Sequence, residues 1–224
     1  MNRRTGFAAP VGIGTVALAV GAPLALAVLE VFHPHVHDLM DVDVRLWLTI
    51  HYAQIPLFML SALAMAALVH GYKGIAPAVC RVALFWFAAS YIPFDTAAGV
   101  VTGVLVQAAR DSGDPGAWRA ALETVWAHPI VGGSGTLSPP PVLAVLGAVA
   151  WSIGGVAAAI ALKRGGHSWA PCLVLVVSAF GLTLFKTHAS PGGPFTFGGL
   201  AIAAAWLLWE RRSRLPAHDI AFLS

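Results

Sequence analysis

Residues Pro141–Leu162 read PVLAVLGAVAWSIGGVAAAIAL, a run of 22 residues without a charged side chain. A helix needs about 20 apolar residues to cross the hydrocarbon core of a bilayer. Because lipid cannot hydrogen-bond the backbone, every N–H and C=O of a spanning element must be satisfied internally, which favours a helix here. The stretch therefore predicts an all-α integral membrane protein.

The composition of the whole chain points to the same class. Of 224 residues, 58% are hydrophobic and only 10% are charged, and the mean hydropathy is +0.78. Soluble domains carry about 25% charged residues, so this composition excludes a soluble globular enzyme and a disordered tail. The 13 Lys and Arg residues are scattered along the chain rather than clustered, which argues against nucleic acid as a partner. The expected partner is the lipid bilayer.

Six apolar runs predict a single transmembrane domain over residues 1–224, a bundle of six helices. They lie at about 11–32, 46–69, 76–106, 141–162, 169–185 and 195–209. The third is long enough to tilt or kink, and Pro93 lies inside it. The first run carries Ala25-Leu26-Ala27, which also fits a signal-peptide cleavage site; cleavage would leave five spans.

The basic residues predict the orientation of these spans. Nine of the 13 fall on the side that holds both termini of a six-span chain: Arg3, Arg4, Lys73, Arg81, Lys163, Arg164, Arg211, Arg212 and Arg214. Arg45, Arg110, Arg119 and Lys186 fall on the other side. Because Lys and Arg accumulate in cytoplasmic loops, we expect a multi-pass protein of the cell's inner or plasma membrane with both termini in the cytoplasm.

The outer loop between the third and fourth spans contains a short amphipathic helix by its sequence pattern. Asp114 is typical of an N-cap and Pro115 of a first helical residue. Trp118, Leu122 and Trp126 recur at helical spacing on one face. Two interpretations remain open, a helix lying on the outer membrane interface and a lid over an outward-facing pocket.

Polar residues at membrane depth form the first candidate site. Charged groups there are costly and are often functional, and they gather in the outer halves of the spans. We predict a proton or cation site from Glu30, His51, Gln54, Asp95, Lys186 and His188. Asp95 is its most informative member, because Gly99 and Gly103 lie on the same helical face and predict close packing against another helix.

A histidine-rich outer segment forms the second candidate site. His33, His35 and His37 alternate and are followed by Asp38, a pattern able to bind Zn²⁺ or Cu²⁺. A solvated polar loop is the alternative. His51 and His188 could ligate a haem from two helices, but a diheme bundle needs pairs at two depths. Since His70 lies about 28 Å from His51 along the helix, haem is not favoured.

The stretch Trp47–Phe58, WLTIHYAQIPLF, and the later Phe94-Asp95 with its glycine-rich continuation resemble a family of small uncharacterised bacterial multi-pass membrane proteins. The resemblance implies a fold of that kind and no activity.

Three functions remain open from the sequence. The first is a bundle whose outward-facing polar cluster binds or conducts a proton or small cation. In this case we expect the protein not to be an enzyme. The second is a membrane-embedded enzyme that acts on a lipophilic substrate with His51 and Asp95 as acid and base. The third is a structural membrane subunit.

Overall fold

The computed structural model describes residues 12–35, 38–129 and 141–213, and within these ranges it is helical, with no strand. Five helices are long and apolar enough to cross a membrane: Ile13–Val31, Val44–Leu68, Ile75–Ser112, Val142–Arg164 and Gly192–Arg212. The remaining apolar segment, Trp169–Phe185, is shorter. The prediction of an all-α protein with several membrane-spanning helices therefore agrees with the structure.

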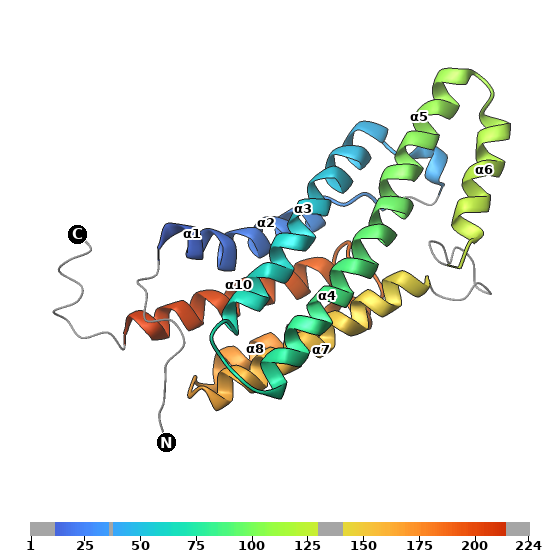
Figure 1. The fold of residues 1–224 in the computed structure, drawn as a ribbon. Coiled ribbons are helices and arrows are strands. Elements are labelled where there is room, and N and C mark those ends of the chain that lie inside the picture. The colour runs from blue at the N-terminus through green and yellow to red at the C-terminus, as the bar shows by residue number, and fades with distance from the viewer. Residues whose placement is uncertain (1–11, 36–37, 130–140, 214–224) are drawn as a thin grey trace.

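Each apolar segment is built from one or more consecutive helices (Figure 1). The first joins α1 (Ile13–Val16), the π-helix η1 (Ala17–Gly21) and α2 (Ala22–Val31), and a 3₁₀ turn η2 (Leu39–Asp41) precedes α3 (Val44–Leu68). The next joins α4 (Ile75–Asp95), the π-helix η3 (Thr96–Val101) and α5 (Thr102–Ser112). The elements that follow are α6 (Pro115–Ala127), α7 (Val142–Arg164), α8 (Trp169–Ala179), α9 (Gly181–Phe185) and α10 (Gly192–Arg212).

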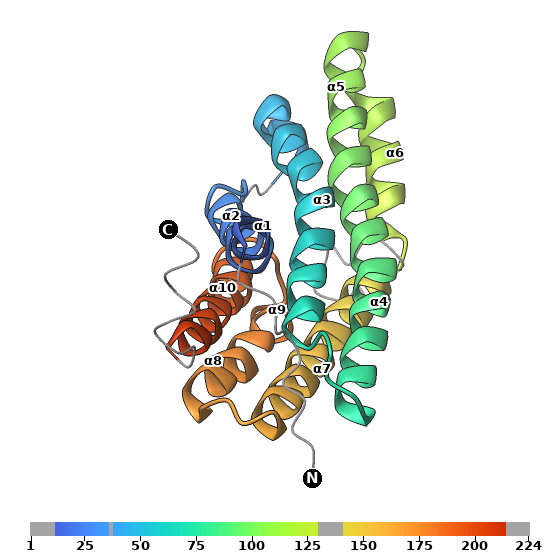
Figure 2. The same cartoon turned by 60° about the vertical axis from the view of Figure 1, so that its left-hand side comes forward.

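Small residues let the central helices pack closely. α7 lies along α4 on one side and along α8 on the other, while α10 lies between α8 and α2 (Figures 1 and 2). A Cβ on Gly154 would meet Leu84 of α4 at 3.3 Å, so the two helices are in direct contact there. Small side chains at such contacts are typical of membrane helices, because packing rather than the hydrophobic effect holds them together.

The α4–η3–α5 helix is much longer than a bilayer is thick. Its 38 residues span about 57 Å at 1.5 Å per residue. Pro93 lies in the last turn of α4, directly before the π-helix η3. At the far end α6 turns back and runs beside α5 (Figures 1 and 2).

The apolar face of α6 packs against other parts of the protein. Leu122 is 3% exposed and packs with Val42, Val44, Trp47 and Val106. The indole Nε1 of Trp126 donates to Thr102 Oγ1 at 2.8 Å. The α5–α6 pair, the segment before α3 and Trp47 of α3 thus form a second apolar cluster.

Candidate metal centre

Three histidines from three separate parts of the chain meet within the helical bundle. His33 follows α2, His51 lies on α3, and His188 lies between α9 and α10. One potential ligand atom from each lies within 4.8 Å of the other two. Nε2 of His33 is 3.3 Å from Nε2 of His51 and 3.3 Å from Nε2 of His188. The imidazole edges that carry Nε2 therefore converge on one point.

Close backbone approach fixes His51. Its ring lies directly on η3, where a Cβ on Gly99 would overlap ring atoms of His51 at under 3.0 Å. Trp47, one turn earlier on α3, donates from Nε1 to the Gly99 carbonyl at 2.7 Å. The G-x-x-x-G spacing of Gly99 and Gly103 thus marks a helix contact, as predicted, and the partner helix is α3.

Contacts with the end of α2 hold the segment that carries His188 in place. The backbone N–H of Ser190 donates to the Glu30 carbonyl at 3.2 Å. A Cβ on Gly193 would meet Glu30 Cγ at 2.6 Å, so only glycine lets α10 begin this close to α2. Because His33 is three residues after Glu30, these contacts bring His188 beside His33.

In each of the three histidines Nδ1, the ring nitrogen that is not at the point of convergence, faces an oxygen atom. His51 Nδ1 is 2.8 Å from the Trp47 carbonyl, and His33 Nδ1 is 3.1 Å from the Pro34 carbonyl. Carbonyl oxygens only accept hydrogen bonds, so both Nδ1 atoms carry the hydrogen and both Nε2 atoms present lone pairs. His188 Nδ1 is 3.2 Å from Tyr91 Oη, a hydroxyl that can accept from this nitrogen or donate to it. Second-shell oxygens orient metal-binding histidines in this way.

The spacing of the three Nε2 atoms suits a metal ion. Lone pairs at 3.3 Å repel each other unless a cation lies between them. Four ligands at Zn–N bonds of 2.0–2.1 Å in a tetrahedron lie about 3.3–3.4 Å apart. Burial and the neighbouring His51 lower the pKa of His33 to about 4. Burial, with the charges of His33 and His51, also lowers the pKa of His188. Neutral imidazole is the form that binds metals.

Two buried carboxyl groups flank the histidines. Asp95 is fully buried, and its Oδ1 lies 3.5 Å from His188 Nε2. Neither oxygen of Asp95 has a hydrogen-bond partner among the described residues. Glu30 is also fully buried, and its Oε1 accepts from Gln54 Nε2 at 2.9 Å while Oε2 has no partner in the described chain. Polar atoms left unpaired in this way are costly, and they often mark a missing ligand.

The structure combines members of the two predicted sites and separates others. Glu30, His51, Gln54, Asp95 and His188 lie together, joined by His33 from the histidine-rich segment. Lys186 is exposed, in a left-handed conformation that ends α9. His35 is exposed, with its ring centroid 6.5 Å from that of His33. Asp38 instead pairs with Arg119 of α6 at 2.9 Å, and His37 lies outside the described residues.

Trp47 and Tyr91 contribute to the site although neither was among the predicted site residues. Trp47 lies four residues before His51, so helical spacing alone places both on one face. The ring centroids of Trp47 and His51 are 4.5 Å apart. Tyr91 lies four residues before Asp95, so the same spacing places these two residues on one face of α4. Trp47 and Tyr91 look like ordinary buried aromatic residues in the sequence.

Aromatic side chains pack against one side of the cluster and against one another. Phe58 lies with its ring centroid 5.9 Å from His188, and it contacts Phe87, Tyr91 and Phe197. Trp151 packs on Phe87 and Phe197 behind it. His33 and His188 are partly exposed, so the cluster reaches the molecular surface.

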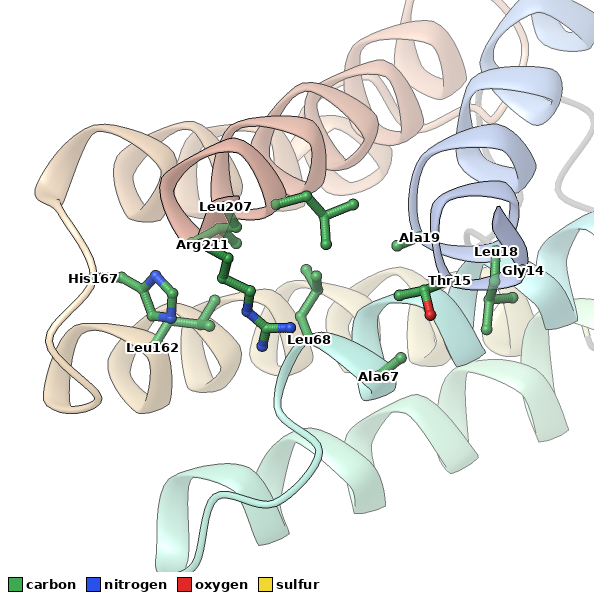
Figure 3. Close-up of a pocket in the computed structure, with 11 residues that line it drawn as sticks. Gly14, Thr15, Leu18, Ala19, Ala67, Leu68, Leu162, His167, Leu207 and Arg211 are labelled. Atoms are coloured by element: carbon green, nitrogen blue, oxygen red, sulfur yellow. The ribbon is translucent and has the colours of Figure 1, made fainter. Parts of the chain in front are cut away.

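A separate cleft lies at the other end of the bundle. It has a volume of about 250 Å³. Figure 3 shows Arg211 and His167 at one end and Thr15, Leu18 and Ala19 at the other. His167 Nδ1 contacts Glu210 at 3.3 Å, and its Nε2 contacts Tyr72 Oη at 3.1 Å. The cleft is mainly apolar, so the convergent ligand atoms of the histidine cluster make that cluster the stronger candidate site.

No protein-family model, curated protein or solved structure matches this chain. The functional assignment therefore depends on the geometry of the cluster.

Proposed function

We propose that this protein is a membrane protein that binds one Zn²⁺ ion through Nε2 of His33, His51 and His188. The observation that carries the proposal is the convergence of three Nε2 atoms whose Nδ1 partners are all oxygens. Three imidazoles are a common ligand set for zinc. The site also takes Cu²⁺ by the same chemistry. Zn²⁺ is preferred because two of the nitrogen separations fit a tetrahedron.

We further propose that six spans and cytoplasmic termini place this site on the outer side of the cell membrane. The segment Trp169–Phe185 acts as the sixth span in this arrangement, and α6 stands on the outer side with the end of α5. The concentration of basic residues at one end of the spans supports this orientation.

The test is the metal content of the protein purified in detergent. Wild type should contain, or take up on titration, one Zn²⁺ per chain, while His51→Ala should bind none. His35→Ala is the matched control: this exposed histidine is two residues from His33 but outside the cluster, so its loss should leave the stoichiometry at one.

The opposite pattern would contradict the proposal. Loss of metal in His35→Ala with retention in His51→Ala would place the metal on the histidine-rich segment instead. Wild-type protein that takes up no Zn²⁺ would remove the metal centre altogether.

A second candidate, a proton or small-cation site, has one observation in its favour. Glu30 and Asp95 are buried carboxyl groups with unpartnered oxygens in the described chain, and such groups hold protons. Against conduction, the aromatic side chains around Phe58 pack against one side of the cluster. Vesicles carrying the protein and an internal pH dye decide this point: conduction requires a proton flux that Asp95→Asn abolishes.

A further inference from the structure

The three histidines leave one corner of a tetrahedral metal ion unfilled. Structural zinc sites use four protein ligands, whereas catalytic sites use three and keep the fourth for water. The group of mutually close ligand atoms in the described chain consists of His33, His51 and His188 and does not include Asp95. Asp95 lies to one side of it, with Oδ1 3.5 Å from His188 Nε2.

Asp95 is placed to contact a ligand of the metal rather than the metal itself. Its two oxygens are buried, and no hydrogen bond within the described residues holds them. The 3.5 Å separation from His188 Nε2 does not satisfy them, because it is longer than a normal hydrogen bond. A water molecule on the fourth corner provides the missing hydrogen-bond donor.

We infer that the metal binds a water molecule beside Asp95 and that the centre hydrolyses a carboxylic ester or amide of a membrane lipid. The inference rests on the proposed zinc site. Asp95 takes a proton from the metal-bound water, and the resulting hydroxide forms a bond to the acyl carbon. The bond from this carbon to the leaving oxygen or nitrogen then breaks. Asp95 passes its proton to that atom, and a second water refills the corner.

The surroundings of the site favour a lipid over a water-soluble substrate. Apolar side chains close in sequence to two of the histidines are exposed: Phe32, next to His33, by 64%, and Leu184 and Phe185, shortly before His188, by 68% and 43%. Lys186 adds a positive charge directly after Phe185. Phe94 lies with its ring centroid 6.4 Å from that of His188. Exposed apolar side chains beside a cation match the level where the acyl chains of lipids meet their head groups.

The test uses zinc-loaded protein in detergent with two probes, 4-nitrophenyl palmitate and 4-nitrophenyl acetate. Wild type should hydrolyse the palmitate ester, and faster than the acetate. Asp95→Asn should keep one Zn²⁺ per chain and lose about 10²–10⁴-fold in kcat, the usual contribution of a general base. Asp111→Asn, an exposed aspartate on α5, is the matched control and should retain wild-type kcat.

Three outcomes overturn the inference and leave the zinc site standing. They are a zinc-loaded wild type that turns over neither ester, an Asp95→Asn variant with unchanged kcat, and a faster rate on acetate than on palmitate. Loss of zinc in a folded Asp95→Asn variant also overturns it, because Asp95 would then be the fourth ligand. A wild type without zinc rejects the proposed function itself.

A second measurement keeps the inference testable if Asp95→Asn does not fold. Wild type loaded with Co²⁺ should change its visible spectrum when azide is added, because azide replaces the water on the fourth corner. A spectrum that stays constant up to molar azide shows a closed site and overturns the inference.

Discussion

Replacing Gly99 by alanine should remove zinc binding without touching any ligand. The imidazole of His51 lies on the backbone of η3, and an added Cβ would overlap its ring atoms at under 3.0 Å, against 3.4–4 Å for ordinary contacts. Gly99 belongs to η3 and cannot retreat easily, because its carbonyl is held by Trp47 Nε1 at 2.7 Å. The His51 ring must therefore move.

The size of this movement sets the expected loss of affinity. Reaching an ordinary contact needs a shift of about 1 Å or more, while metal–ligand distances tolerate about 0.2 Å. We expect the affinity for Zn²⁺ to fall by more than the 10–100-fold typical of losing a second-shell partner. Competition with a chromophoric zinc chelator measures it in detergent.

A matched glycine separates this effect from a general effect on the helix. A Cβ on Gly198 of α10 would meet only Ala27 Cβ, at 3.8 Å, so Gly198→Ala should bind zinc as wild type does. If Gly99→Ala binds Zn²⁺ with wild-type affinity, then His51 does not ligate the metal in the position described, and the reasoning fails.

Three further predictions concern the surroundings of the site. Trp47→Phe keeps an aromatic side chain but removes the hydrogen bond to Gly99, so it should cost about 1–3 kcal/mol of stability, and an unchanged denaturation midpoint in detergent would contradict this. Arg119 lowers the pKa of Asp38 below its ordinary value; the stabilisation from this pair should exist at pH 7 and disappear as the pH falls through the lowered pKa. Melting curves should therefore show Arg119→Ala less stable than wild type at pH 7 and equal to it at a pH below the lowered pKa, whereas a difference that persists in acid would assign the effect to packing. In intact cells, with Cys80 and Cys172 replaced by alanine, a membrane-impermeant thiol reagent should label Ser112→Cys and spare Ser213→Cys, and the reverse pattern would invert the proposed orientation.

Sequence patterns predict most of the fold because they act locally. Pro141–Leu162 becomes α7, Val142–Arg164, and the other apolar runs become helices within a few residues of the predicted ends. The third run is different: it was predicted to end near residue 106, but the helix continues to Ser112. Its last turns are polar and leave the apolar pattern, yet they stay helical. Packing against α6 accounts for this, since Val106 and Ala109 are buried there.

The grouping of the site residues was not predictable from the sequence in the same way. His33, His35 and His37 are neighbours along the chain, but contacts between distant segments determine which imidazoles meet. The N–H of Ser190 reaches the Glu30 carbonyl, and Gly99 lets α3 lie on η3. Each contact joins a single small group in one segment to a group in a segment distant along the chain. The periodic pattern of apolar residues carries no information about such a fit. The sequence therefore indicates the polar residues and their depth but not their arrangement.

Charge explains why these residues belong together. Glu30 and Asp95 are fully buried, and among the described residues no Lys or Arg pairs with either. A buried carboxylate without a counter-charge is strongly unfavourable, and three neutral imidazoles do not supply one. One divalent cation at the three Nε2 atoms balances both carboxylates, giving a site with no net charge. The same cation removes the repulsion between the Nε2 lone pairs. Protons on the two carboxyl groups remove their charge but leave the Nε2 atoms facing one another, whereas one divalent cation resolves both sources of electrostatic strain.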